Sequence, residues 1–299
     1  MPTKDADVTQ ISPIFWLSTA IGALRKNIVL TRLVRRDMDT IVANEGKTIT
    51  IPKRGSVSVR TKAAGLPITS DSPTSTGVDV TLDTRKYVSW AIEDGASAKA
   101  VKDGVDYVTD AMIGLAESVD ADVAAQYTNF TTEVGTAGTD IDQDTILEAR
   151  LSLNTLLCPQ TDRFLVVSAK DEISILREPQ FVSSDKRGQA GIDALTEAQL
   201  GRIYGFDVYM SQSIVSTSAP TTYHGWAACP HAVALASRAL PLPEAGSGAI
   251  GMIMPDPVSG LVFRYVQAYS ATDQAMIRTI DCLYGLATVD VRMAVEVLS

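Results

Sequence analysis

The sequence predicts an α+β fold in which strands near both ends of the chain flank one long helix and an α/β body. Three observations indicate this. Alternating apolar residues mark strands in 48–54 and 78–92. One apolar stripe with spacings of three and four runs through 97–127, which is typical of a helix. Alternation returns in 260–298, so the chain ends in long strands.

Residues 1–45 are expected to form an N-terminal arm. Their one apolar stretch, Ile14–Leu17, is followed by the basic sequence RKNIVLTRLVRR (25–36), and no unit here could form its own core. This basic sequence has no acidic residue and no interleaved aromatic ring to stack bases, which favours an acidic protein surface over nucleic acid. Both contacts hold if the arm lies on the inside of a container.

Residues 46–92 are expected to form an extended β-hairpin loop. Ile49 and Ile51 alternate with Thr before Pro52, and VDVTLD (78–83) and KYVSWAI (86–92) follow as strands. The intervening segment of roughly 25 residues is rich in Ser, Thr, Gly and Pro, and loops of that length are functional or disordered. Its tip has too few apolar residues to pack on its own subunit.

Residues 93–135 are expected to contain a long spine helix, with Asp94 or Ser97 capping its start. Some 30 helical residues make a rod of roughly 45 Å. Its apolar stripe consists of Val101, Val105, Val108, Met112, Leu115, Val119 and Val123. Its opposite face carries Asp103, Asp106, Asp110, Glu117, Asp120 and Asp122. This acidic face is available to meet the basic arm.

The α/β pattern occupies residues 136–257. We expect helices over 142–157 and 171–178, with Asp171 near the cap of the second, and strands over 163–169, 206–215 and 232–238. After this body, 260–270 and 274–285 are expected to pair as a hairpin within residues 258–283. Residues 284–299 are expected to form a C-terminal strand.

Composition and charge limit the class of protein. The chain has 299 residues, of which 45% are hydrophobic and 20% charged, a globular balance, and its net charge of -9 does not suit wrapping by nucleic acid. The charge is uneven: residues 1–70 carry +6 and the rest -15. The two parts can attract each other within a chain or between copies; a basic surface patch with no special partner is the alternative. Three separated cysteines and an apolar run too short to span a bilayer favour an intracellular protein without a disulfide framework.

The glycine motif does not predict a nucleotide site. Gly246, Gly248 and Gly251 fit G-x-G-x-x-G, a spacing that binds pyrophosphate only between a strand and a helix. Prolines on both sides disfavour those elements, so we expect a flexible surface loop. The sequence EGKT (45–48) resembles the end of a P-loop, but the first glycine of that motif is missing.

The chain offers little that resembles a metal or catalytic site. His224, Cys229 and His231 are three potential ligands without an obvious fourth, and packing at a strand end is the expected role. There is no G-x-S-x-G elbow for a nucleophilic serine. We therefore expect no enzyme activity, no cofactor, and no catalytic, cofactor-binding or metal-binding residue.

The order of arm, hairpin, acidic helix, α/β body and terminal strands resembles the tailed-bacteriophage major capsid proteins of the Hong Kong 97-like fold. The resemblance covers essentially the whole chain, and its motifs are soft signatures without catalytic residues. They are TITIPKRG (48–55), YVSWAIE (87–93), GRIYGFDVYMSQSIV (201–215), HGWAACPHAVALASR (224–238), RYVQAYS (264–270) and DCLYGLATVDVRMAVEV (281–297).

The resemblance implies a domain plan. Residues 93–135 (the spine helix) and 258–283 (a hairpin) would form the peripheral domain, and residues 136–257 the axial domain, to which 284–299 returns. The arm and extended loop would reach neighbouring subunits. We therefore expect inter-subunit contacts at a set of charged residues from the arm, the loop and the spine helix. They are Arg25, Lys26, Arg32, Arg35, Arg36, Lys53, Arg54, Arg60, Lys62, Asp103, Asp106 and Asp110.

The resemblance also implies a function and partners. The chain would assemble with itself through pentamers and hexamers into an icosahedral shell around double-stranded DNA, contacting the DNA non-specifically on the inner face. A separate scaffolding protein, a portal and a decoration protein are further expected partners; no membrane is expected. The protein would lie in the virion after assembly in the host cytoplasm. An encapsulin-type bacterial compartment shell is the alternative, and a nucleotide- or metal-dependent enzyme is the third hypothesis.

Overall fold

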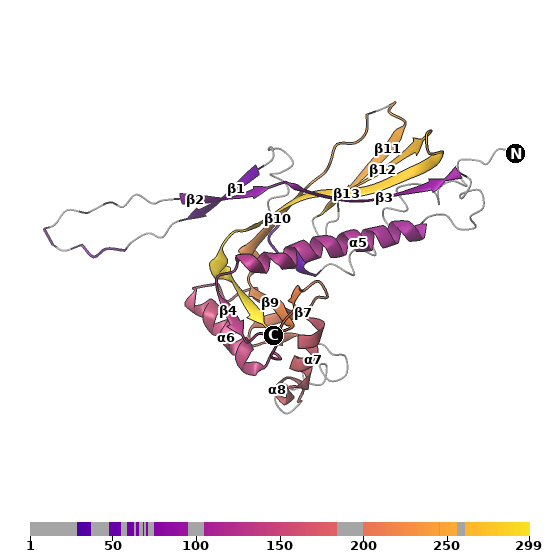
Figure 1. Ribbon diagram of the computed structural model, residues 1–299. Coiled ribbons are helices and arrows are strands. Elements are labelled where there is room, and N and C mark those ends of the chain that lie inside the picture. Colours follow the sequence, from indigo (N-terminus) through magenta and orange to yellow (C-terminus); the bar gives the residue numbers. More distant parts are fainter. Residues whose placement is uncertain are drawn as a thin grey trace.

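The computed structural model describes most of the chain after residue 28. The described residues are 29–36, 48–54, 59–62, 64, 65, 68, 70, 75–94, 105–183, 200–244, 246–255 and 261–299. They form a β-hairpin, a five-stranded sheet, a seven-stranded sheet and several helices, of which the longest lies between the two larger sheets (Figure 1).

The hairpin consists of β1 (Thr48–Arg54) and β2 (Ser75–Thr81). The strands are antiparallel and in register from the Thr48–Thr81 pair to the Arg54–Ser75 pair. Its base packs on the rest of the molecule, where Ile49, Ile51, Val80 and Leu82 bury their side chains against Ala234 and Ala236. Figure 1 shows β1 and β2 extending away from both larger sheets.

The five-stranded sheet is antiparallel throughout, and the long strand β13 is its centre. β13 passes close to the hairpin base at Gly285, where a Cβ atom would collide with the carbonyl oxygen of Thr81. The 260–270 and 274–285 segments pair as expected. The strands are β3 (Thr84–Glu93), β10 (Val233–Arg238), β11 (Ala249–Pro255), β12 (Val262–Ser270) and β13 (Ala275–Thr288).

The expected spine helix is α5 (Val105–Ala124), which the 3-10 helix η3 (Ala125–Asn129) extends. The described part of its apolar stripe is buried, with Met112, Val119 and Val123 fully so. These side chains lie in one core with residues of both larger sheets, such as Tyr265 and Trp226. One amphipathic helix thus holds the two sheets together.

The seven-stranded sheet is mixed, since β5 pairs with β7 and β4 with β14 in parallel. Its side chains on one face join the α5 core, and those on the other pack under two helices. The strands are β4 (Glu133–Gly135), β5 (Phe164–Val167), β6 (Arg202–Ile203), β7 (Phe206–Met210), β8 (Ser216–Thr217), β9 (Thr222–Ala228) and β14 (Ala294–Leu298). The remaining helices are α2 (Leu30–Leu33), α6 (Gln143–Thr155), α7 (Ala169–Arg177), α8 (Pro179–Val182), η4 (Pro230–Ala232) and η5 (Val291–Met293).

Local signals explain the two helices on the sheet. Asp142 caps α6 by accepting a hydrogen bond from the backbone N–H of Thr145 at 2.8 Å. Ser168 caps α7, and Asp171, which we expected near the cap, closes a capping box with it three residues later. Ile146 and Ile175 then point from the two helices into the same core.

The structure corrects part of the expected grouping. β10 and β11, from residues assigned to the α/β body, lie in the five-stranded sheet. The final strand is interrupted: β13 ends at Thr288, η5 turns the chain, and β14 enters the seven-stranded sheet. Because of this break, the alternating residues 286–298 contribute to strands in both larger sheets. β14 thus places the C-terminal strand in the seven-stranded sheet, and the division of the chain into peripheral and axial domains stays a prediction.

Candidate assembly surfaces

The arm meets the spine helix at a buried carboxylate. Asp120, fully buried in α5, accepts hydrogen bonds from the backbone N–H of Thr31 at 3.2 Å and from its hydroxyl at 3.4 Å. The hydroxyl of Ser211, just after β7, donates to the other carboxylate oxygen at 3.3 Å. Burial raises the pKa of Asp120, and these hydrogen bonds oppose the rise. One side chain therefore joins arm, spine helix and α/β body.

The described part of the arm packs on its own subunit. Leu30 and Val34 belong to the α5 core, and the backbone of Arg35 forms a parallel bridge to Ala234 in β10. We expected the arm to need another surface throughout. For residues 29–36, this surface is the spine helix of the same chain. Leu30 and Val34, which are four residues apart, both pack in its core.

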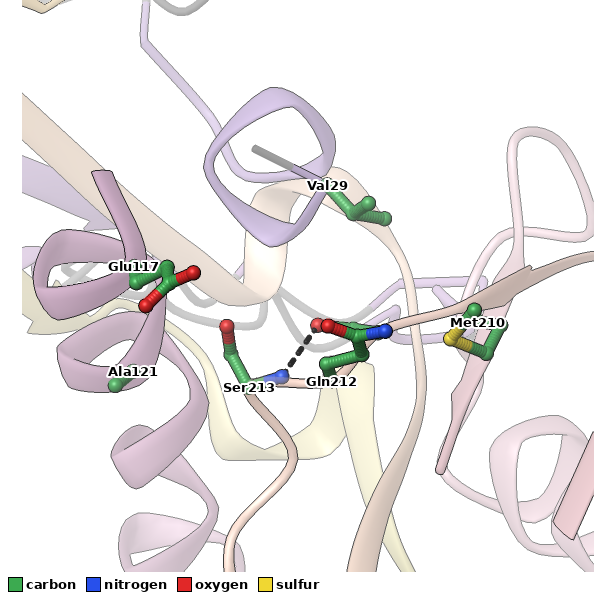
Figure 2. A pocket seen from close by; sticks show the side chains of 7 residues that line it. Val29, Glu117, Ala121, Met210, Gln212 and Ser213 are labelled. Carbon is green, nitrogen blue, oxygen red and sulfur yellow. Dashed lines mark hydrogen bonds between the residues drawn. The ribbon is translucent and has the colours of Figure 1, made fainter. Parts of the chain in front are cut away.

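A cavity of about 540 Å³ adjoins this junction. Figure 2 shows its lining: Val29 from the arm, Glu117 and Ala121 from α5, Met210 at the end of β7, and Gln212 and Ser213 just after it. The backbone N–H of Ser213 donates to the Ser211 hydroxyl at 3.1 Å, which fixes this segment. Among the described residues of the lining, Glu117 is the one ionisable side chain.

On its sheet side, α5 is held by ion pairing within the subunit. Lys86 of β3 lies 2.7 Å from Asp122 and donates to the hydroxyl of Ser118 at 2.6 Å. The hydroxyl of Tyr284 also donates to Asp122. Part of the acidic face that we expected to meet the arm therefore pairs with the molecule's own sheet.

The opposite face of the five-stranded sheet carries a second charged cluster. Asp281 is fully buried and accepts hydrogen bonds from Arg264 at 2.6 and 3.0 Å and from Arg85 at 2.6 Å. A groove of about 330 Å³ lies beside these groups and is bordered by Pro241–Pro243. The β11 strand passes under this border at Gly251, where a Cβ atom would lie 2.5 Å from Pro243 Cδ.

The hairpin carries exposed apolar and basic side chains beyond its base. Val59 and Ile68 are 99% and 76% exposed, and Arg60 and Lys62 are exposed beside them. Lys53, nearer the base, lies 3.0 Å from Asp290 of the same chain. The described residues of this loop, 59–62, 64, 65, 68 and 70, are all exposed, and packing of its tip on a neighbouring copy stays a prediction.

The structure describes only some of the residues that we expected at contacts between subunits. Arg32 and Asp110 are exposed, on α2 and α5 respectively, whereas Arg35 and Arg36 are half-buried. Arg25, Lys26 and Asp103 lie outside the described residues, as do the side chains of Arg54 and Asp106. Contact of these residues with a neighbouring subunit stays a prediction. Sequence reasoning placed Asp120 on the acidic helix face but did not predict its burial, and it missed Thr31 and Asp281, because a buried acid cannot be distinguished from a solvated one by residue type.

The two histidines and Cys229 do not converge. His224 pairs with Glu296 through Nδ1, lies 3.1 Å from the Thr217 hydroxyl through Nε2, and stacks on Tyr127 at 4.2 Å. His231 is exposed in η4, and Cys229 points toward Cys158. Within the described parts of the chain, no three His, Cys, Asp or Glu side chains gather as metal ligands would.

The glycine motif is a turn and an edge strand. Gly246 and Gly248 have φ of 88° and 75°, the left-handed region that glycine allows, and β11 begins at Ala249. We expected a flexible loop and missed this strand; Pro255 is tolerated because it ends a strand at the sheet edge. A strand follows the glycines where a nucleotide-binding loop requires a helix N-terminus.

Comparison with known proteins places this fold. No family model matches the chain, and no curated protein matches its sequence. The structure of Mycobacterium phage Che8 is similar with a TM-score of 0.73 and 21% identity, and covers 91% of each chain. The capsid structure of the Cyanophage P-SCSP1u is similar with a TM-score of 0.64 and 13% identity, over 90% of this chain and 87% of that one.

A virus-like particle from Pyrococcus furiosus is also similar, with a TM-score of 0.55 and 10% identity, over 96% of this chain and all of that one (100%). These likenesses extend over nearly the full length, so the whole α+β architecture is shared. The chain has the fold of phage capsid proteins, which confirms the fold expected from sequence. No α-helix in the described residues has the length and apolar character to cross a membrane.

Proposed function

We propose that this chain is a major capsid protein that assembles with itself through pentamers and hexamers into an icosahedral shell around viral double-stranded DNA. The shared fold supports the proposal, but a fold alone does not fix a function. The observation that carries it is the hairpin: Val59 and Ile68 are exposed on an element that extends away from its own subunit. Such side chains are expected to be buried on another copy.

The shell proposal also names a contact partner for the hairpin and further partner molecules for the protein. The hairpin, with Arg60 and Lys62, would contact acidic surface of a neighbour, since residues 71–299 carry a charge of -15. A separate scaffolding protein, a portal and a decoration protein are proposed partners, together with DNA bound non-specifically on the inner face. The protein would act in the virion after assembly in the host cytoplasm, as a structural protein and not as an enzyme.

The experiment is negative-stain electron microscopy combined with sedimentation of the purified, nuclease-treated protein, with and without scaffold. Closed shells, or free pentamers and hexamers, are expected. A uniform monomer or dimer that never assembles would contradict the proposal and reopen the enzyme hypothesis. An unchanged melting temperature with added nucleotide or chelator would count against that enzyme hypothesis.

An encapsulin-type compartment shell is the second candidate. The observation behind it is that a virus-like particle from Pyrococcus furiosus, a cellular organism, has a similar fold. A co-purifying cargo protein inside the shells would support this candidate, whereas packaged genomic DNA would support the capsid.

A further inference from the structure

Two cysteines that are distant in sequence meet inside the α/β body. Cys158 follows the end of α6 and Cys229 follows the end of β9, 71 residues later. Their sulfur atoms are 2.7 Å apart, and the two residues are 6% and 2% exposed. Both are free thiols. A disulfide bond is about 2.05 Å long, so only a small movement separates this pair from bonding distance.

The backbone holds each cysteine in place. The Cys158 N–H donates to the carbonyl of Leu153 at 3.0 Å, at the last turn of α6. The Cys229 N–H donates to the carbonyl of Met293 at 3.0 Å, just before β14. The two sulfurs are thus brought together by a helix end and a strand end that are fixed independently, without requiring either chain segment to move.

A buried arginine lies beside the pair. Arg163 is 3% exposed and donates to the carbonyl of Cys158 at 2.6 Å, to the carbonyl of Pro159 at 2.7 Å and to Oδ1 of Asn154 at 2.8 Å. The hydrogen bond from the Cys229 thiol lowers the pKa of Cys158 to about 7, with help from the Arg163 charge and against desolvation. The same partnership raises the pKa of Cys229. We take Cys158, the thiol with the lowered pKa, as the nucleophile of the pair.

We propose that Cys158 and Cys229 form a modification site, a dithiol that a small peroxide oxidises to a disulfide in the folded protein. The Cys158 thiolate attacks one peroxide oxygen and the O–O bond breaks; with one proton this gives a sulfenic acid and water. The Cys229 sulfur then attacks the sulfenic sulfur, loses its proton and displaces the second water. Overall, two thiols and one hydrogen peroxide give one disulfide and two waters.

The bond would fasten the end of α6 to the end of β9, a strand inside the sheet that α6 covers. Closing a loop of this length restricts the unfolded chain and stabilises the fold. In a reducing cell the pair stays a dithiol, and after release into an oxidising medium it closes. The inference concerns one subunit and does not depend on shell assembly.

The third cysteine supplies an internal control. Cys282 is equally buried, but it lies in β13 of the other large sheet, and burial raises its pKa to about 12. It has neither the nearby sulfur nor the lowered pKa of Cys158. If solvent access alone controlled oxidation, the three thiols would react alike. The proposal instead predicts that Cys158 and Cys229 are oxidised and Cys282 is not.

The test is peptide mapping of the full-length protein, first fully reduced and freed of reductant, then treated with hydrogen peroxide under native conditions. A peptide pair linked through Cys158 and Cys229, lighter by two hydrogens, is expected, with Cys282 still a thiol. Recovery of Cys158 and Cys229 as separate thiols or sulfinic acids would overturn the proposal, as would a bond that forms only in urea.

Thermal unfolding tests the effect of the bond. Oxidised wild-type protein and Cys282→Ser are each expected to melt about 5 °C above their reduced forms. Cys229→Ser should lose this difference, and Cys158→Ser repeats the test if the first variant folds poorly. An equal increase in all the variants would show that oxidation acts elsewhere and would contradict the proposal.

Discussion

The hairpin exposes apolar side chains to solvent, whereas the α/β body buries them. In the body, Trp226, Val166 and Val297 are at most 1% exposed, and helices cover the sheet. In the hairpin, apolar side chains at the base are buried, whereas Val59 and Ile68 lie in solvent. Full burial of one such side chain is worth about 1.5–3 kcal/mol. The body has realised this gain within one chain, whereas in the proposed shell Val59 and Ile68 would realise it on a neighbouring copy.

Removing the far part of the hairpin should have the largest effect on assembly and almost none on the fold. Arg54 and Ser75 face each other in the ladder, so a two-residue Asn-Gly turn can replace residues 55–74. We expect a folded subunit with an unchanged melting temperature that forms no particles by sedimentation. A large fall in melting temperature would show that the loop stabilises its own subunit. The hairpin would then not differ from the α/β body in the way described above.

The matched change in the body should have the reverse effect. Trp226 packs edge-on against Phe130 with ring centroids 5.0 Å apart, and its indole N–H has no hydrogen-bond partner to lose. Trp226→Ala should therefore cost about 3–5 kcal/mol of unfolding free energy through the cavity it leaves. Urea denaturation of the unassembled subunit measures this. A loss below about 1 kcal/mol would mean that the core is not organised around this residue.

The contact between Asp120 and Thr31 tests how firmly residues 29–36 of the arm are held on their own subunit. These residues are partly buried, so the effect of a substitution should lie between those in the hairpin and in the α/β body. Asp120→Ala leaves the backbone N–H of Thr31 buried without its acceptor, at a cost of about 1–3 kcal/mol. Asp120→Asn keeps an acceptor oxygen and removes a buried charge, so we expect a much smaller loss. Unfolding free energies together with limited proteolysis near residues 29–36 separate the two variants. Equal behaviour would show that the carboxylate does not anchor the arm.

Asp290 links the hairpin base to the body and predicts a pH dependence. Hydrogen bonds from Arg292, and then the contact with Lys53, lower its pKa to about 2. A depressed folded-state pKa contributes stability that is present above the unfolded value of about 3.9 and is lost as pH falls toward the folded one. Between about pH 4 and 2, Asp290→Asn should show a shallower loss of unfolding free energy than wild type. Parallel curves would contradict this.

Charge at the hairpin should have the smallest effect. Arg60→Gln with Lys62→Gln is expected to leave the unfolding free energy within about 0.5 kcal/mol. It should also reduce the salt dependence of particle assembly, because exposed charges are screened at high salt. Sedimentation at low and molar salt measures this. If wild-type particles are equally stable at both, apolar contacts such as those of Val59 dominate.

Much of the fold could be predicted because period and length are local properties. The α5 stripe, the β1–β2 hairpin and the β12–β13 hairpin all follow from alternation or helical spacing. β9 was missed because it is buried on both faces and has no alternation to detect. β11 was missed because its glycines and prolines are typical of loops, and only its edge position and its close approach to Pro243 accommodate them.

The candidate surfaces were less predictable than the fold. Exposed basic residues on the hairpin could be inferred from its composition, but the buried roles of Asp120 and Asp281 depend on partners about 90 and 200 residues away in sequence. The cysteines show the same limit. Their spacing predicted no pairing, and only the folded chain brings Cys158 and Cys229 together.

Hydrogen exchange of the hairpin in particles and in dissociated subunits tests the central claim most directly. Amides of residues 59–70 should exchange slowly in particles and rapidly in free subunits, while those of β5 and β9 stay protected in both. Rapid exchange of the hairpin in intact particles, equal to that in free subunits, would contradict the claim that this element is buried on a neighbouring copy.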